Sequence, residues 1–234
     1  MLSRNILRYG RREPLPEQTP LRAGPLTLIC EAGDLRYIKL GDCEIPRRVY
    51  VAVRDRKWST VQPVLSNVRI DAGDNAFRIT NDVEHKQGEI DFAWRSTISG
   101  DVKGTITFTM DGVARSTFLR NRIGFCVLHP MRECAGQSCI VEHTDGTREC
   151  GAFRKSISPH QPFVGIDAIS HKVLSGVWVE VRFAGDTFEM EDQRNWTDAS
   201  FKTYSTPLDL PYPVEIREGT LTLLPYAVAR IDCA

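Results

Sequence analysis

The feature that most constrains the fold of this chain is the absence of any long helical periodicity. Apolar and β-branched residues come instead in short runs, many of them alternating with polar residues, which is typical of half-buried strands. Turn-forming residues such as Gly33, Gly41, Gly73 and the pair Asn81–Asp82 separate the runs at hairpin-like intervals. We therefore expect strands at residues 26–30, 34–40, 48–53, 64–71, 76–83, 90–98, 104–110, 118–130, 139–143, 153–158 and 177–183.

The length of 234 residues and the number of expected strands favour a single all-β domain, and no repeat of fixed period divides the chain. We expect a large antiparallel two-sheet β-sandwich over residues 21–218. Residues 1–20, rich in arginine and proline, predict an extended N-terminal arm, and residues 219–234 form a C-terminal tail. In such a sandwich, one sheet face and the loops around it carry the functional site.

The charge balance argues against polyanionic partners. Lys plus Arg and Asp plus Glu each total 30, so the formal net charge is +0 and no basic excess attracts nucleic acid or an anionic membrane. No apolar run approaches the roughly 20 residues that span a bilayer, and the arginine-rich N-terminus has no secretory signal pattern. We expect a cytoplasmic protein with small-molecule partners.

The seven cysteines are an odd set without a CxxC pair, which predicts neither a disulfide framework nor a zinc ribbon. Cys134, Cys139 and Cys150 do lie near His129 and His143, but their spacings match no common metal-ligand pattern. The motifs of serine α/β-hydrolases, zincins, dinucleotide-binding proteins and P-loop proteins are absent as well. We expect no metal and no cofactor, and chemistry based on carboxylate, histidine and arginine.

Residues 189–204 carry the densest polar pattern in the chain and have no helical apolar stripe. Carboxylates, amides and basic groups bind sugar hydroxyls, and a tryptophan ring covers the apolar face of a sugar. The alternative is a solvated loop in which Trp196 enters the core. On the first interpretation one wall of a sugar-sized pocket consists of Glu189, Asp192, Arg194, Asn195, Trp196, Asp198 and Lys202.

Two further polar segments are expected to face that wall. Arg122 belongs to an Arg-Asn-Arg cluster that can hold a carboxylate or vicinal hydroxyls, or equally pair with the acids of residues 189–192 as a structural network. His129 ends an apolar strand and His160 lies between two prolines, so either is a candidate for proton transfer. With Asp192, these histidines form the predicted catalytic set.

Several unusual stretches resemble the D-apionate lactonase family. They include residues 21–28, 33–38 and 49–55, the sequence NRIGFCVLHP at 121–130, the sequence SPHQPF at 158–163, and residues 189–204. The resemblance runs from about residue 6 to residue 218 and implies a hydrolase of carbohydrate metabolism that opens D-apionolactone to D-apionate in apiose catabolism. The implied ligand is a small sugar lactone or sugar acid.

The chain departs from the family pattern in two ways. Family members are much longer, with a β-sandwich followed by a barrel-like domain, so we expect this chain to correspond to the first domain and the barrel to be absent from it. After Ile216 the tail no longer resembles the family. Two hypotheses remain open: a lactonase whose acid and base lie on this sandwich, and a non-catalytic sandwich that binds carbohydrate or braces a neighbouring domain.

Overall fold

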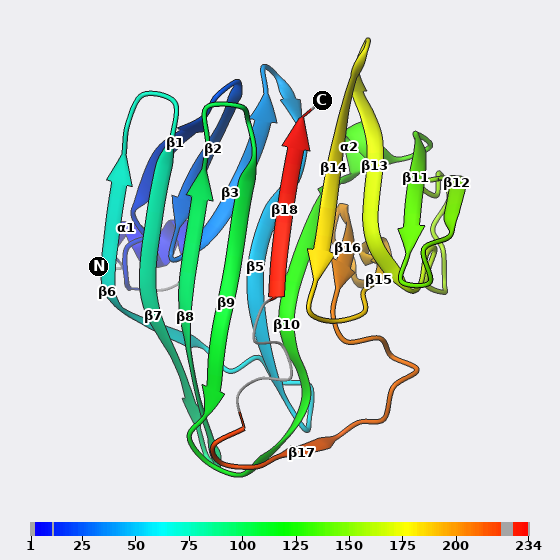
Figure 1. Ribbon diagram of the computed structural model, residues 1–234. Coiled ribbons are helices and arrows are strands. Elements are labelled where there is room, and N and C mark those ends of the chain that lie inside the picture. The colour runs from blue at the N-terminus through cyan, green and yellow to red at the C-terminus, as the bar shows by residue number, and fades with distance from the viewer. Residues whose placement is uncertain (1–2, 11, 221–226, 234) are drawn as a thin grey trace.

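The computed structural model describes residues 3–10, 12–220 and 227–233, and two antiparallel β-sheets packed face to face dominate it (Figure 1). The expected all-β two-sheet sandwich is confirmed. Within the described residues sheet A contains, along its main path, β1 (Gln18–Ala23), β2 (Leu26–Glu31), β3 (Asp34–Leu40), β5 (Arg48–Asp55), β10 (Phe118–Pro130), β16 (Ser200–Tyr204) and β15 (Glu189–Asp192). The short strands β4 (Cys43–Glu44) and β17 (Val214–Ile216) pair with β3 and β10.

Sheet B is the front layer in Figure 1. Its order is β12 (Arg148–Ala152), β11 (Ser138–His143), β13 (Ile166–Leu174), β14 (Val177–Ala184), β18 (Ala227–Cys233), β9 (Ile106–Ala114), β8 (Ile90–Gly100), β7 (Phe77–Gln87) and β6 (Pro63–Ala72). The strand β18 lies between β14 and β9 and pairs antiparallel with both. A segment from the end of the described chain therefore occupies the interior of this sheet.

Helices are short and peripheral. They are α1 (Arg4–Tyr9), α2 (Met131–Cys134) and the 3-10 turn η1 (Gln193–Trp196). The side chain of Ser3 accepts the Ile6 amide at the start of α1, and Gly10 ends the helix in the left-handed conformation. Among the described residues, no helix has the length and apolar character needed to cross a bilayer.

The core lies between the sheets and follows from the alternation of the strands. On β9, Ile106, Phe108 and Met110 are buried while the intervening threonines face the other side, as expected of a strand with alternating apolar and polar residues. Phe108 meets Phe125 of β10 edge to face, with ring centroids 5.0 Å apart. Since each fully buried aromatic side chain contributes about 1.5–3 kcal/mol, this interface is a major source of stability.

Two local predictions are wrong. The pair Asn81–Asp82, expected in a turn, lies within β7, where Asn81 is opposite Ser96 and buried. The strand expected at 153–158 is absent from the structure, and the chain there forms an irregular segment that follows β12. In both cases the local residue types suit either structure, and pairing with distant strands decides between them.

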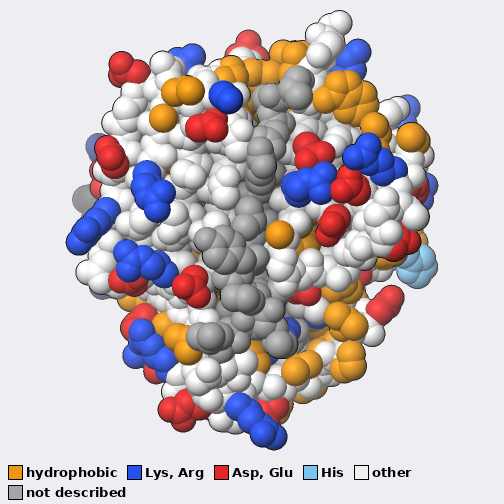
Figure 2. All heavy atoms as spheres, in the orientation of Figure 1, with side chains coloured by type: hydrophobic (Ala, Val, Ile, Leu, Met, Phe, Trp, Pro, Cys, Tyr) orange, Lys and Arg blue, Asp and Glu red, His pale blue; other side chains and the backbone are white. Residues whose placement is uncertain are grey.

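The charged side chains on the face shown in Figure 2 are interspersed by sign rather than gathered into one patch. In sheet B, Lys86 pairs with Asp91 and Arg182 pairs with Glu180. This face therefore offers no extended basic surface for a polyanion.

Candidate functional site

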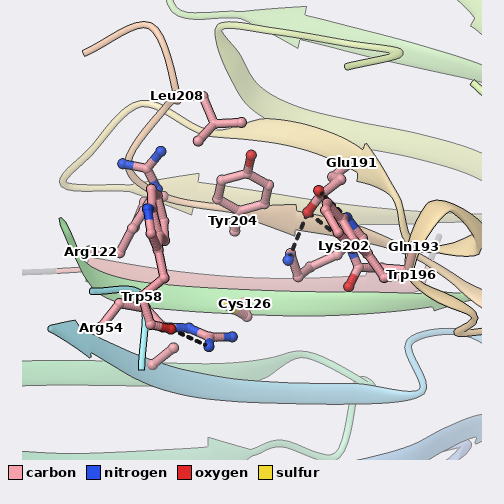
Figure 3. A pocket seen from close by; sticks show the side chains of 12 residues that line it. Arg54, Trp58, Arg122, Cys126, Glu191, Gln193, Trp196, Lys202, Tyr204 and Leu208 are labelled. Carbon is pink, nitrogen blue, oxygen red and sulfur yellow. Dashed lines mark hydrogen bonds and ion pairs between the residues drawn. The ribbon is translucent and has the colours of Figure 1, made fainter. Parts of the chain in front are cut away.

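A cleft of about 540 Å³ lies on the outer face of sheet A (Figure 3). Along β10, Ile123 and Phe125 face the core, so Arg122 and Cys126 must face the opposite side. The cleft is lined by residues from β5, β10, β15, β16, η1 and two loops: Ala52, Arg54, Trp58, Arg122, Cys126, Glu191, Gln193, Trp196, Lys202, Tyr204, Ser205 and Leu208.

The floor of the cleft is apolar. Ala52, Cys126 and Tyr204 form a small buried cluster on three neighbouring strands, and Tyr50 packs against it. Ser205 borders the floor where β10 has Gly124, and a Cβ at that glycine would clash with Ser205 Oγ. The glycine thus permits the close approach of the 205–208 wall to the sheet.

One end of the cleft presents a buried guanidinium among aromatic rings. Arg122 is 5% exposed, and its Cζ lies 5.1 Å from the ring centre of Trp58 and 5.8 Å from those of Tyr204 and Tyr212. Nη1 donates to the carbonyl of Asn121 at 3.3 Å, whereas Nε and Nη2 have no hydrogen-bond partner among the described residues. Burial lowers the pKa of Arg122. Free donors on a buried cation mark a place for an anionic or carbonyl oxygen.

The other end presents a carboxylate held by three donors. Glu191 accepts hydrogen bonds from Trp196 Nε1 at 2.7 Å and from Gln193 Nε2 at 2.7 Å, and pairs with Lys202 Nζ at 2.8 Å. Burial of Glu191 opposes ionisation, but Lys202 and these hydrogen bonds outweigh it and lower the pKa of Glu191. Trp196 is 69% exposed, and its hydrogen bond to Glu191 holds the ring in place. Such a ring can cover the apolar face of a sugar.

Tyr204 lies between the two ends (Figure 3). Its hydroxyl donates to Glu189 Oε1, which also accepts the Leu208 amide at 2.8 Å. Glu189 is itself buried and does not line the cleft. It therefore connects the floor to the 205–208 wall instead of contacting a ligand.

Asp192 and Arg194, expected in the pocket wall, anchor a neighbouring loop. Asp192 is 0% exposed and accepts Ser158 N at 2.9 Å and Arg194 Nη2 at 2.7 Å. Arg194 also donates to the carbonyls of Arg154, Lys155 and Ser156 at 2.8–3.0 Å. Neither residue lines the cleft.

Asn195 and Asp198 are exposed and also lie outside the cleft lining. Asn195 Nδ2 donates to Ser158 O at 2.6 Å, and Asp198 accepts from Ser200 Oγ at 3.0 Å. Together with Asp192, Asn195 holds the segment that leads to His160 next to η1.

The two candidate histidines occupy different environments. His129 is 0% exposed, is hydrogen-bonded through Nε2 to Thr203 Oγ1 at 2.9 Å, and lies 5.8 Å from the ring of Phe153. Burial, together with the nearby His171, lowers the pKa of His129 to about 3. His160 is exposed, and its carbonyl accepts Ser158 Oγ at 2.8 Å. Only His160 is open to solvent, while His129 faces the interior between the sheets.

Of the ten residues predicted for the site, the structure places Arg122, Trp196 and Lys202 together in the cleft. Trp58, Tyr204 and Glu191 also line the cleft, although the sequence pattern did not predict them as ligand-contacting residues. The alternation of β16 offered a signal for Tyr204, because it shares a strand face with Lys202. Trp58 follows β5 and reaches the cleft only through the tertiary fold. Among the described residues, no group of three or more His, Cys, Asp or Glu side chains is placed to hold a metal ion.

The sequence of residues 6–223 matches the protein family described as the D-apionate lactonase N-terminal domain. A curated protein, D-apionate lactonase of Brucella anthropi, is 41% identical over 215 residues. That match covers 90% of this chain and 35% of the relative, so the chain spans about a third of the relative's length.

Solved structures share the fold at low sequence identity. A putative aldose 1-epimerase of Escherichia coli K12 has a TM-score of 0.57 at 10% identity, with 93% of this chain and 99% of that chain covered. A β-arabinopyranosidase has a TM-score of 0.58 at 10% identity, with 93% of this chain and 40% of that one covered. These likenesses concern the architecture of the sandwich alone.

Proposed function

This chain belongs to the D-apionate lactonase N-terminal domain family, and we propose that its sheet A cleft binds the sugar lactone D-apionolactone for hydrolysis to D-apionate. The proposal extends to a role in apiose catabolism in the cytoplasm. The observation that carries it is the guanidinium of Arg122, buried among aromatic rings with two donors free, at one end of a cleft of sugar size.

Ester hydrolysis creates negative charge at a defined place. Water adds to the lactone carbonyl carbon, the bond to the ring oxygen breaks, that oxygen leaves as a hydroxyl, and the product is a carboxylate. The Nε and Nη2 donors of Arg122 suit both the developing oxyanion and the product carboxylate. Arg122 therefore fits the carbonyl end of the ligand.

The opposite end fits the hydroxyl-bearing part of the ligand. Lys202 and Glu191 offer a donor and an acceptor side by side, and Trp196 offers a flat apolar surface beside them. The floor of Ala52, Cys126 and Tyr204 suits the carbon skeleton. A sugar lactone has this distribution of polar and apolar groups.

Of the three residues predicted to transfer protons, His160 is the one we retain for that role, because it is exposed while His129 and Asp192 are buried. His160 lies outside the cleft lining, on a segment that Asp192 and Asn195 hold to η1, so in this proposal it acts on the ligand through a water molecule. Asp192 and Arg194 then act by positioning this segment. His129 stabilises sheet A through its hydrogen bond to Thr203, and Glu189 stabilises the 205–208 wall through its hydrogen bond from the Leu208 amide.

A second candidate is binding without turnover. Among the described residues that line the cleft there is no histidine, and their one carboxylate, Glu191, is already engaged by three donors. Since the chain spans 35% of its relative, the activity of the whole relative remains a proposal for this chain.

The division into an arm at 1–20, a sandwich at 21–218 and a tail at 219–234 also remains a proposal. The tail includes residues 221–226 and 234, which lie outside the described residues.

The test is calorimetric titration of D-apionolactone and D-apionate, combined with an assay of acid release. We expect micromolar to millimolar binding of both compounds, weakened at least tenfold in Arg122→Met because a charge-assisted hydrogen bond is lost. Arg95→Met, at an exposed arginine on sheet B, is the matched control and should bind normally. Acid release by the chain alone supports the lactonase, binding without release supports the second candidate, and no binding rejects both.

A further inference from the structure

The strand β17 pairs with the beginning of β10 at one end of the sandwich (Figure 1). A second cleft, of about 690 Å³, is lined by residues of these two strands and of neighbouring loops. Arg120 and Asn121 of β10 line it together with Asp186, Thr206 and Leu210. It shares Arg122 with the sheet A cleft, but its other lining residues are different. The function proposed above assigns no role to it.

A β-bulge shapes this cleft. The pairing of β10 with β5 shifts between Arg120 and Arg122, so Asn121 is the extra residue with no partner opposite it on β5. Bulges redirect side chains and are common beside functional sites. Here the bulge allows three consecutive residues, 120–122, to line one cleft.

The bulged residue has an unsatisfied amide. Asn121 is 1% exposed, and within the described part of the chain neither its Nδ2 nor its Oδ1 has a hydrogen-bond partner. Leaving both atoms unpaired is unfavourable, because a buried donor or acceptor has lost its hydrogen bonds to water without replacing them. A ligand that both accepts and donates would satisfy the amide.

The side chain of Arg120, beside Asn121, forms no hydrogen bond or ion pair with the described residues, and its Nε is buried. The carboxylate of Asp186 attracts this guanidinium through space without a direct contact. Asp186 lines the same cleft, but its carboxylate accepts Thr206 Oγ1 and Thr187 N, both at 2.8 Å. Elsewhere, the half-buried Arg48 and Arg182 pair directly with Asp34 and Glu142. Arg120 therefore differs from Arg48 and Arg182 and resembles its neighbour Arg122.

We propose that this second cleft is a ligand site, in which Arg120 and Asn121 bind the oxyanion of a small carboxylate or phosphate compound. The guanidinium fork pairs with two oxygens of an anion, and Asn121 Nδ2 adds a donor while its Oδ1 accepts from a ligand hydroxyl. Burial lowers the pKa of Arg120, and a bound anion offsets that desolvation. Ile123, Leu210 and Pro211 supply an apolar border that restricts the ligand to a small molecule.

The test uses Arg120→Met, which keeps the length of the side-chain stem and removes its charge. Inorganic phosphate, acetate and a neutral monosaccharide are titrated separately into the wild-type chain and the variant. We expect phosphate or acetate to bind the wild type, the neutral sugar not to use this site, and Arg120→Met to lose at least tenfold in anion affinity. The tighter of the two anions identifies a phosphate or a carboxylate as the natural group.

Trp196→Ala, which changes only the sheet A cleft, is the matched control and should leave anion binding unchanged. Equal anion affinity in wild type and Arg120→Met overturns the proposal, as does loss of anion binding in Trp196→Ala. If Arg120→Met does not fold, the wild type is treated with phenylglyoxal, and mass spectrometry measures whether the anion protects Arg120. Absence of protection at saturating anion overturns the proposal equally. These outcomes do not depend on whether D-apionolactone binds.

Discussion

The hydroxyl of Tyr204 donates to Glu189 Oε1 at a distance of 2.5 Å, and both side chains are buried. Tyr204→Phe leaves the Glu189 carboxyl with the Leu208 amide as its remaining described donor. We expect the free energy of unfolding to fall by about 1–3 kcal/mol, because a buried acceptor loses its partner. Urea unfolding measures this, and Tyr9→Phe at an exposed position should have no effect. An unchanged midpoint in Tyr204→Phe would contradict the bond's structural importance.

We expect replacement by methionine to have different effects on stability at Arg122 and at Arg194. Arg194 holds Asp192 and three backbone carbonyls, so Arg194→Met removes a partner from a buried carboxylate and should destabilise the fold by about 3–5 kcal/mol. Arg122 has no ion pair with a described carboxylate, so Arg122→Met leaves no buried carboxylate unpaired and should be neutral or stabilising. Thermal unfolding of the two variants side by side tests this. A large loss of stability in Arg122→Met would place Arg122 in the structural framework.

Buried histidines predict acid sensitivity. Burial, reinforced by His171, lowers the pKa of His129 to about 3, and burial lowers that of His171 to about 4, from about 6.5. The unfolded chain therefore binds protons below pH 6.5 that the folded chain excludes until pH 3–4. The contribution of these two histidines to the free energy of unfolding is therefore fully present above pH 6.5. It decreases as the pH falls from 6.5 to 4, by about 1.4 kcal/mol for each histidine and each unit by which its pKa is lowered.

The comparison that isolates this effect is His129→Gln, which stays neutral at every pH and can still bond Thr203. Its stability should depend less steeply on pH than that of the wild type, whereas His160→Ala should keep the wild-type slope. Asp34, whose pKa burial raises to about 6 against the pull of Arg48, contributes with the opposite sign in all three proteins and cancels. Equal slopes in wild type and His129→Gln would contradict the prediction.

We expect replacement of Trp196 to weaken sugar binding while leaving the stability of the fold nearly unchanged. Because its side chain is exposed and makes one described side-chain bond, to Glu191, Trp196→Ala should change the unfolding free energy by less than about 0.5–1 kcal/mol. Loss of a stacked aromatic surface should weaken sugar binding by about 0.5–1.5 kcal/mol. Titration with D-apionate measures the second quantity, and Trp178→Ala on sheet B is the matched control. Unchanged affinity would remove Trp196 from the site.

The fold could be predicted because burial alternates with period two along most strands, as Ile106, Phe108 and Met110 illustrate. The same rule could have separated Arg122 from His129, since an odd separation on one strand places two side chains on opposite faces. Grouping them by polarity alone brought an interior histidine into the predicted pocket. Strand parity therefore distinguishes the cleft-facing Arg122 from the interior His129.

The rest of the cleft depends on contacts that no local pattern contains. Trp58 and Tyr212 meet edge to face with ring centroids 5.0 Å apart, and both lie against Arg122. Their segments are far apart in the sequence, and neither forms part of a motif. The roles of Asp192 and Arg194 were also hidden, because their partners are mainly backbone groups of the 154–158 segment.

The position of β18 affects how the protein folds while it is being synthesised. The strands β9 and β14 lie on either side of β18 and end at residues 114 and 184. Their facing edges therefore have no partner strand until residues 227–233 emerge from the ribosome. At roughly 5–20 residues per second, translation leaves these edges open for seconds. During that interval the nascent chain carries two strand edges inside an incomplete sheet, where a chaperone or another nascent chain can pair.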